Sequence, residues 1–186
     1  MIRLVAIGGT TKPGSSTERA LGVAVAAARA AGAEVEVFAC TELVALPHYG
    51  TDAAMQSEIG ARLVQAARSA DGVLIASPGY HGGVSALVKN AIDYLEDLAR
   101  DDRPYLDGRT VGLIATAYGH QAAVSTLSAL RTIAHALRGW PTPLGAAIRT
   151  TADLFDAAGQ CRDDAVRGQL ELVARQVLKG VALARA

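Results

Sequence analysis

The chain has 186 residues, of which 51% are hydrophobic and 19% are charged, so it can bury one core without disulfides or metals. Eighteen basic residues balance eighteen acidic ones, and this lack of a basic surplus excludes nucleic-acid binding as a main role. No apolar run reaches the roughly 20 residues of a membrane span and no signal peptide precedes the first strand, so we expect a cytoplasmic protein without a membrane partner.

Short apolar runs alternate with longer Ala- and Leu-rich stretches of helical period along the chain. Strands are predicted over residues 2–7, 34–38, 72–76 and 110–115 and within 143–148. Helices are predicted over residues 17–31, 53–70, 120–139 and 163–183, and from the end of the 77–83 loop to about 98. This alternation predicts an α/β fold with a parallel sheet in a single domain, residues 1–186. Two strand orders suit the pattern, and the pattern does not choose between them.

Three loops follow the carboxyl ends of the first, third and fourth predicted strands. In an open parallel sheet, ligands bind outside the carboxyl ends of the strands, near the point where the strand order reverses. These three loops are therefore the places to look for binding residues.

The first loop combines glycines, hydroxyl groups and the start of a helix. Free N–H groups and the positive end of a helix favour a bound phosphate. The candidate residues are Gly9, Thr10, Lys12, Gly14, Ser15, Ser16 and Thr17. The alternatives are that Ser16 or Thr17 only caps the helix and that Lys12 is a solvated loop lysine.

Two common kinds of phosphate loop do not match this segment. Ser15 stands where a nucleoside-triphosphate loop requires a lysine. The GxGxxG pattern of dinucleotide-binding folds is missing, because Gly8 and Gly9 are adjacent and Gly14 is too distant. A hydroxyl-rich loop of this kind favours a phosphate monoester such as that of FMN.

The loop after the third strand places a proline and glycines beside an aromatic residue. Its candidates for contact with a flat ligand are Pro78, Gly79, Tyr80, His81 and Gly82. The edge of a flavin ring carries carbonyl groups, an N–H and ring nitrogens, which backbone amides can satisfy without titratable side chains. His81 is either a proton donor to reduced flavin or substrate, or a loop histidine that hydrogen-bonds the backbone.

This loop and the following helix resemble the NADPH-dependent FMN reductase family, whose members are similar to flavodoxin in fold. The family has a Pro-x-Tyr-Asn-Gly loop before a helix with Leu-Lys-Asn-Ala-Ile-Asp. The matching residues are Pro78, Tyr80, Gly82, Leu87, Lys89, Asn90, Ala91, Ile92 and Asp93. The first loop, residues 9–15, resembles the family's Gly-Ser-x-Arg-x-x-Ser. The chain departs from the family where His81 replaces Asn, where Lys12 replaces Arg, and at residues 84–85, where a proline is common.

The resemblance implies a flavodoxin-like three-layer sandwich with a five-stranded parallel sheet in the order 2-1-3-4-5. It also implies FMN as cofactor, NADPH or NADH as co-substrate, and a homodimer or homotetramer with the flavin near a subunit interface. The loop after the fourth strand would then flank the flavin ring with Thr116, Ala117, Tyr118, Gly119 and His120. Tyr118 is the candidate for stacking on the ring. His120 either approaches the polar edge of the ring or only caps the next helix.

No other chemical site is predicted. His48 and His135 lack partners at ligand spacing, so no metal is expected, and no side chain is assigned a catalytic role. His135 is expected to pack within a helix and Trp140 to be buried. Cys40 and Cys161 lie outside any CxxC pattern and are expected to be reduced thiols.

We therefore predict an oxidoreductase that transfers hydride from NADPH or NADH to FMN and passes the electrons to free flavin, a quinone or another small oxidant. The flavin performs the difficult chemistry, which fits the lack of acid–base machinery in the loops. A flavin-dependent monooxygenase is a candidate partner. The alternative is a flavodoxin-type electron carrier or FMN-binding protein without its own nicotinamide oxidation. A dehydrogenase in which Glu36 binds a ribose is a weaker rival.

Overall fold

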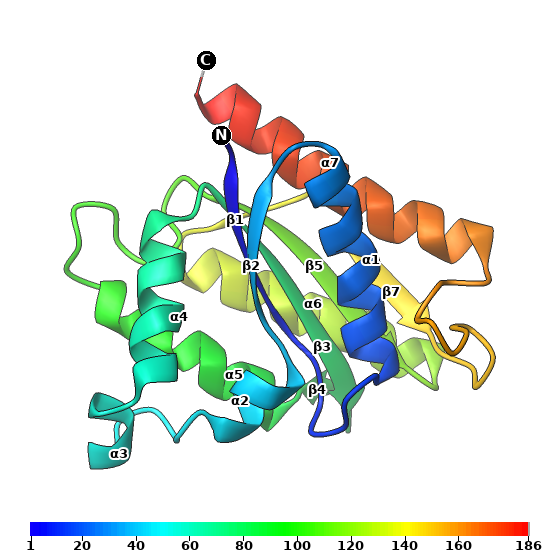
Figure 1. Ribbon diagram of the computed structural model, residues 1–186, viewed down its shortest axis with the longest axis horizontal. Helices are drawn as coiled ribbons and strands as arrows, with labels where there is room; N and C mark the ends of the chain where they lie inside the picture. The colour runs from blue at the N-terminus through cyan, green and yellow to red at the C-terminus, as the bar shows by residue number, and fades with distance from the viewer. Residues whose placement is uncertain (186) are drawn as a thin grey trace.

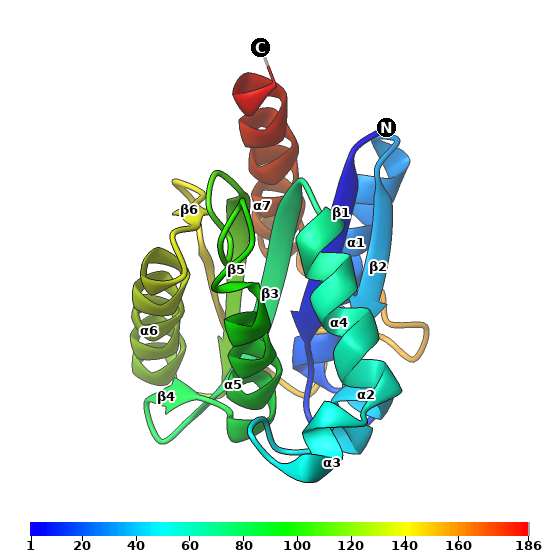
Figure 2. The same cartoon turned by 90° about the vertical axis from the view of Figure 1, so that its left-hand side faces the viewer.

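The structure is a computed structural model that describes residues 1–185, in which a central sheet is covered by helices on both faces (Figure 1, Figure 2). The strands are β1 (Arg3–Gly8), β2 (Glu34–Phe38), β3 (Gly72–Tyr80), β4 (Gly83–Val84), β5 (Thr110–Ala117), β6 (Trp140–Pro141) and β7 (Ala146–Arg149). The helices are α1 (Ser16–Ala30), α2 (Cys40–Ala45), α3 (Asp52–Met55), α4 (Glu58–Ser69), α5 (Ala86–Asp93), the 3₁₀ helix η1 (Tyr94–Leu98), α6 (His120–Ala136) and α7 (Asp164–Ala184). The predicted α/β class is confirmed.

The sheet differs in part from the predicted five-stranded order. Its main path runs β2-β1-β3-β5-β6 with all strands parallel, and β7 also pairs with β5, further along that strand than β6 does. This path corresponds to the predicted order 2-1-3-4-5, but the sheet has seven strands, because β4 and β7 lie off the path and β4 forms a hairpin with β3. The fifth strand is divided because Pro143 has no N–H and the N–H of Leu144 donates to Gln176 Oε1 at 2.9 Å.

Both faces of the sheet are buried, which explains the continuously apolar central strands. In β1, Val5 and Ile7 belong to the core shared with α4, α5 and α6. Leu4 and Ala6 point the other way, into the core shared with α1 and α7. A strand covered on both faces has no solvent side, so polar alternation is lost.

Three predicted helices differ from the structure at their ends or in their interior. The helix predicted over 53–70 is two helices, α3 and α4, because Ser57 caps α4 and accepts the N–H of Gly60 at 3.1 Å. Helix α1 is capped by Ser15, not by Ser16 or Thr17. The helix after the 77–83 loop continues as a 3₁₀ turn, η1, and the short helix α2 was not predicted.

Two side chains expected to be buried are exposed. Trp140 is 70% exposed because β6 is the outermost strand, and the described residues supply no layer beyond it. His135 lies on the exposed side of α6. Cys40 and Cys161 are both free and buried, as reduced thiols in a core would be.

Arg109 is the largest fully buried side chain and fastens the amino end of β5 to the end of α4. Its guanidinium donates to the carbonyl oxygens of Ala70 at 3.0 Å, Arg68 at 2.7 Å and Tyr105 at 3.0 Å. Burial disfavours the charged form and lowers the pKa of Arg109 to about 10. The guanidinium thus satisfies the carbonyls that α4 leaves open at its end.

The two ends of the chain meet beside β1, at the upper end of the molecule in Figure 1. The Asp71 carboxylate accepts the N–H of Arg3 at 2.7 Å and lies 2.7 Å from the guanidinium of Arg185. Burial by itself would raise the pKa of Asp71, but these two partners outweigh it and hold the pKa below its usual value.

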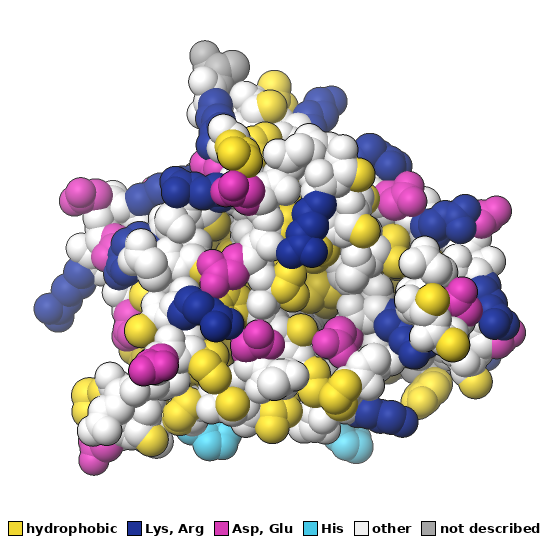
Figure 3. All heavy atoms as spheres, in the orientation of Figure 1, with side chains coloured by type: hydrophobic (Ala, Val, Ile, Leu, Met, Phe, Trp, Pro, Cys, Tyr) yellow, Lys and Arg dark blue, Asp and Glu magenta, His cyan; other side chains and the backbone are white. Residues whose placement is uncertain are grey.

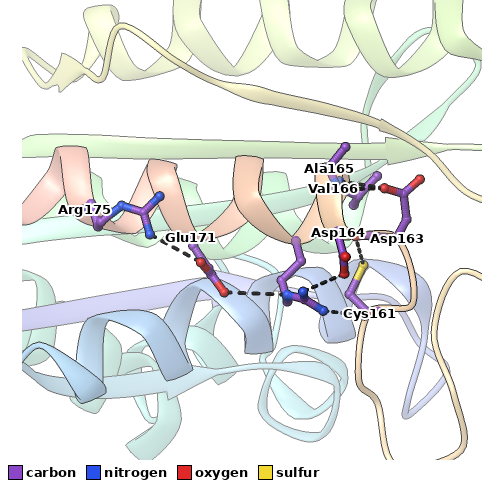
Figure 4. Close-up of polar contacts among 8 residues, drawn as sticks. Cys161, Asp163, Asp164, Ala165, Val166, Glu171 and Arg175 are labelled. Carbon is purple, nitrogen blue, oxygen red and sulfur yellow. Dashed lines mark hydrogen bonds and ion pairs between the residues drawn. The ribbon is translucent and has the colours of Figure 1, made fainter.

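Helix α7 begins with a well-formed cap (Figure 4). Asp163 accepts the N–H groups of Ala165 at 2.8 Å and Val166 at 3.0 Å. Arg167 then pairs with Asp164 and Glu171 along the helix surface. The segment between β7 and α7 reaches α1, where Arg19 donates to the Asp156 carbonyl at 2.9 Å. Among residues 1–185, no helix is long and apolar enough to cross a membrane.

Candidate functional site

The three predicted binding segments lie together at the carboxyl edge of the sheet. In the sheet register, Gly8 of β1 faces Ala76 of β3, and Pro78 of β3 faces Thr116 of β5. This edge is at the bottom of Figure 1 and Figure 2, where histidine and hydrophobic side chains reach the surface (Figure 3). The ends of β1, β3 and β5 are therefore neighbours along one edge of the sheet.

A hydrogen bond between two threonines joins the first segment to the third. The hydroxyls of Thr17 and Thr116 lie 2.6 Å apart, and the two side chains are 2% and 3% exposed. Because each hydroxyl is engaged with the other, these side chains hold α1 against the end of β5.

The first loop presents its main chain to solvent. Gly9 and Gly14 have φ angles of +139° and +69°, which favour glycine. The Thr10 hydroxyl accepts the N–H of Lys12 at 3.0 Å and shapes the turn. Lys12 is exposed, and none of the ion pairs within residues 1–185 includes it. The first N–H groups of α1 have no acceptor within the helix, so an anion at this point would meet donors and a positive helix end.

Glu18 closes this loop from inside the helix, a contact that was not predicted. Its carboxylate accepts the N–H of Gly14 at 2.6 Å, while its own N–H donates to Ser15 Oγ at 3.3 Å. The spacing Ser15-x-x-Glu18 is that of a capping box, the signal that was available in the sequence, although the carboxylate accepts from Gly14 and not from the cap residue Ser15 itself. A carboxylate is therefore already bound by an amide of the loop.

The second segment, residues 78–82, belongs to a tight hairpin and not to the irregular loop that was predicted. Strand β3 continues through Pro78 and Gly79 to Tyr80, which pairs with Gly83 of β4. The two turn residues, His81 and Gly82, have φ angles of +52° and +81°. Positive φ at both positions is the type I′ pattern, which favours Asn-Gly and is less suited to His-Gly. His81 is exposed at the tip.

Residues outside the predicted set hold this hairpin in place. Ser77 is buried, and its hydroxyl accepts the N–H of Ser85 at 3.1 Å. Thr126 of α6 donates to the carbonyl of Gly83 at 3.2 Å. A Cβ at Gly79 would lie 2.7 Å from Thr126 Oγ1, so the close approach of β3 to α6 requires glycine here. The hairpin is thus a fixed platform.

The third segment is also partly strand. Thr116 and Ala117 end β5, and Tyr118 follows with 84% of its surface exposed. Arg149 of β7 donates to the Tyr118 carbonyl at 3.3 Å. His120 is the first residue of α6 and is exposed, but it does not cap the helix, because the cap position is Gly119 and no side chain bonds there.

Comparison with known proteins identifies the family of the chain. The sequence profile of the family described as NADPH-dependent FMN reductase matches residues 2–153. The chain belongs to this family. Members are oxidoreductases that use FMN, with NAD(P)H as co-substrate, and this flavin reductase does the same.

The relatives of this flavin reductase include another flavin reductase and an azoreductase. The NADH-dependent flavin reductase subunit 2 of Lactobacillus johnsonii is 27% identical over 135 residues, 67% of this chain and 71% of that protein. An NADPH azoreductase of a Bacillus species is 30% identical over 86 residues, 46% of this chain and 45% of that protein. Among solved structures, the flavoenzyme NAD(P)H:(acceptor) oxidoreductase FerB from Paracoccus denitrificans has a TM-score of 0.76 at 20% identity, covering 97% of this chain and 99% of that one. This last likeness supports the flavodoxin-like fold.

Proposed function

We propose that residues 1–186 form one FMN-binding domain whose flavin takes hydride from NADPH or NADH and passes the electrons to a small acceptor. The observation that carries this proposal is the Thr17–Thr116 hydrogen bond, which holds the first loop at the end of β5, next to the end of β3, whose hairpin with β4 packs against α6. A phosphate loop and a flat platform side by side suit a ligand with a planar ring and one anionic tail.

The FMN phosphate would lie at the first loop. The N–H groups of Ser16 and Thr17 begin a helix of 15 residues and would donate to it. The hydroxyls of Thr10 and Ser15 and the ammonium group of Lys12 are the nearby side-chain donors. Gly9 and Gly14 carry no Cβ, so the main chain can come close to the phosphate, and any other residue would be strained at these φ angles.

The isoalloxazine ring would lie between the hairpin and the β5 loop. On one side the main chain of residues 78–82 would meet the polar edge of the ring, held by Ser77 and Thr126. On the other side residues 116–120 would flank it. FMN bound there supplies the hydride-accepting ring, so the protein needs to bind, orient and shield it.

The exposed tyrosines at this edge would receive the substrates. Tyr80 in the hairpin is 55% exposed, and Tyr118 after β5 is 84% exposed. An open aromatic rim can take a planar nicotinamide and, after it leaves, a planar acceptor. We infer free flavin, a quinone or another small oxidant as this acceptor, in line with relatives that include a flavin reductase and an azoreductase.

The wider setting follows from the same proposal. A flavin-dependent monooxygenase would consume reduced flavin, and a homodimer or homotetramer would cover the exposed Tyr118 near the ring. The two buried free thiols are compatible with the reducing cytoplasm. A flavodoxin-type carrier is disfavoured, because such carriers look strongly acidic whereas this chain has eighteen basic and eighteen acidic residues.

A titration followed by a turnover assay tests the proposal. Purified protein is titrated with FMN, and binding is followed by the flavin absorption band and fluorescence. NADPH and NADH oxidation are then measured with added FMN and with a quinone. We expect saturable flavin binding and oxidation of at least one nucleotide. Flavin binding without any nucleotide oxidation would contradict the reductase and favour the carrier.

A variant of Gly79 supplies the control. Gly79→Val places atoms against Thr126 and α6 and should displace the platform. It should lower flavin affinity and nucleotide oxidation together. Gly168→Val serves as the matched change, because Gly168 lies in α7, outside the three segments, and a side chain there would meet nothing within 4 Å.

A further inference from the structure

A groove lies at the end of the sheet opposite the candidate functional site. It is formed between β6 and the C-terminal part of α7, near the top of Figure 2, and has a volume of about 740 Å³. Thr110, the first residue of β5, lies on its floor, whereas Ala117 ends β5 at the other edge of the sheet. The groove is thus roughly 23 Å from that edge along the strand, and its volume is that of a small-molecule site.

The β6 side of the groove cannot add another strand. The N–H groups of Trp140 and Thr142 both donate at 2.9 Å to carbonyl groups at the start of β5. The alternate positions, whose N–H groups would point away from β5, are Pro141 and Pro143, and proline has no N–H. The outer edge of residues 140–143 therefore offers no donor for strand pairing, and the exposed indole of Trp140 can be covered only through side-chain contacts.

Both walls of the groove are held in place without a ligand. On the β6 side, Arg131 of α6 donates to two carbonyl groups of residues 142–143, at 3.2 and 3.1 Å. On the α7 side, Gly180 packs so closely on Thr110 that a Cβ would lie 2.8 Å from Thr110 Cγ2. The end of α7 is fixed by the ion pair of Arg185 with Asp71, at 2.7 Å. A ligand would therefore meet a preformed surface and would lose little affinity to ordering it.

The lining of the groove combines flat apolar surface with hydrogen-bond donors. Trp140 and Leu183 line it and are 70% and 68% exposed. Gln176 and Lys179 are three residues apart on α7 and so lie on the same face of the helix. Gln176 Oε1 already accepts the N–H of Leu144 at 2.9 Å, which leaves the amide NH₂ as a donor. Among residues 1–185, those that line the groove include one lysine and no acidic residue.

Helix α7 determines where an anionic group would lie in the groove. The helix ends at Ala184, and its last carbonyl groups carry a partial negative charge. Lys179 lies more than one turn before that end, and none of the ion pairs within the described residues includes it. An acid group would therefore lie beside Lys179 and Gln176, with its ring directed toward Trp140.

We propose that this groove is a second ligand site, which binds a planar aromatic carboxylic or sulfonic acid. The ring packs on the indole of Trp140, and the acid group accepts hydrogen bonds from Lys179 and Gln176. The site lies outside the three segments proposed to hold FMN. The inference therefore goes beyond the proposed function and does not depend on it.

The position of Trp140 gives the experiment a site-specific signal. It is the only tryptophan of the chain, so its indole N–H gives a single resonance in a proton–nitrogen correlation spectrum. The full chain is titrated with anilinonaphthalene sulfonate and, separately, with phenylnaphthylamine, which has the same rings without the sulfonate. Both titrations are repeated by calorimetry with Trp140→Ala, Lys179→Gln and the control Arg175→Gln. Arg175 lies one turn before Lys179, pairs with Glu171 at 3.3 Å and is not among the lining residues.

We expect the sulfonate to shift the indole resonance of Trp140 saturably. Lys179→Gln should weaken the sulfonate about threefold to fivefold, the effect of losing one exposed ion pair, and leave phenylnaphthylamine within about twofold. Trp140→Ala should weaken both probes about tenfold, because both lose the aromatic contact. Arg175→Gln should leave both constants within about twofold, and saturating FMN should not displace the sulfonate.

Four results would overturn the inference. Binding of the sulfonate without a shift of the indole resonance would place the probe elsewhere. Equal effects of Lys179→Gln and Arg175→Gln would show that the acid group is not recognised in the groove. An indole resonance that moves with protein concentration, together with a dimer in sedimentation, would show that a second copy covers the groove. Displacement by FMN would show that the groove is no separate site. Flavin binding and nucleotide oxidation are measured independently, so each of the first three results leaves the proposed function intact.

Discussion

The hydrogen bond between Thr17 and Thr116 makes a prediction about stability and ligand binding at once. Replacing either threonine by valine keeps the shape of the side chain but leaves the other hydroxyl buried without its partner. Both residues are at most 3% exposed, so each single variant should lose about 1–3 kcal/mol of unfolding free energy. The double variant Thr17→Val with Thr116→Val removes both polar groups and should lose less than the sum of the singles.

The assay is urea unfolding at 25 °C for the four proteins of this double-mutant cycle. We expect a coupling energy of about 1–2 kcal/mol, and a shift in Tm of about 2–4 °C for each kcal/mol in a chain of this size. FMN affinity should change little in the double variant, since the two hydroxyls bind each other. Additive losses would refute the hydrogen bond, and a large loss of FMN affinity in the double variant would show that the hydroxyls bind the ligand instead.

Four further changes test other parts of the structure. His81→Asn should raise the unfolding free energy by about 0.5 kcal/mol and preserve flavin binding, because Asn adopts positive φ more readily in a type I′ turn; equal or lower thermal stability would contradict the turn assignment. Gly180→Ala should cost about 1–3 kcal/mol despite the better helix propensity of alanine, because its Cβ would lie 2.8 Å from Thr110 Cγ2; urea unfolding should show partial rescue by Thr110→Ala. Arg109→Met should cost about 3 kcal/mol or more in urea unfolding, because three carbonyl groups lose their donor. Asp71 has a lowered pKa in the folded protein, so its contribution to stability is present above pH 3.8 and is lost as the pH falls through the folded pKa. When the pH is lowered from 5 to about 3, the Tm of Asp71→Asn should therefore fall less than the Tm of the unchanged protein.

The main path of the sheet could be predicted only from the resemblance to the family, because the hydrophobic periodicity suits two strand orders. The ends of the strands could not. Pro78 and Gly79 are typical of loops, yet β3 continues through both, because Ser77 and Thr126 fix the hairpin through contacts distant in sequence. The gap between β6 and β7 depends on Leu144 donating to a glutamine 32 residues away. The ends of these strands are determined by tertiary hydrogen bonds, which hydrophobic periodicity does not indicate.

The site was predicted as a set of neighbouring loops, and its internal arrangement was not. Thr17 and Thr116 are 99 residues apart, so nothing in the sequence indicates that their hydroxyls bind each other. The exposure of Trp140 was also missed, because a large apolar residue is usually buried, and the sequence does not show that Trp140 lies in the outermost strand of the sheet. Both errors concern which partner a side chain meets, a property of the folded sheet as a whole.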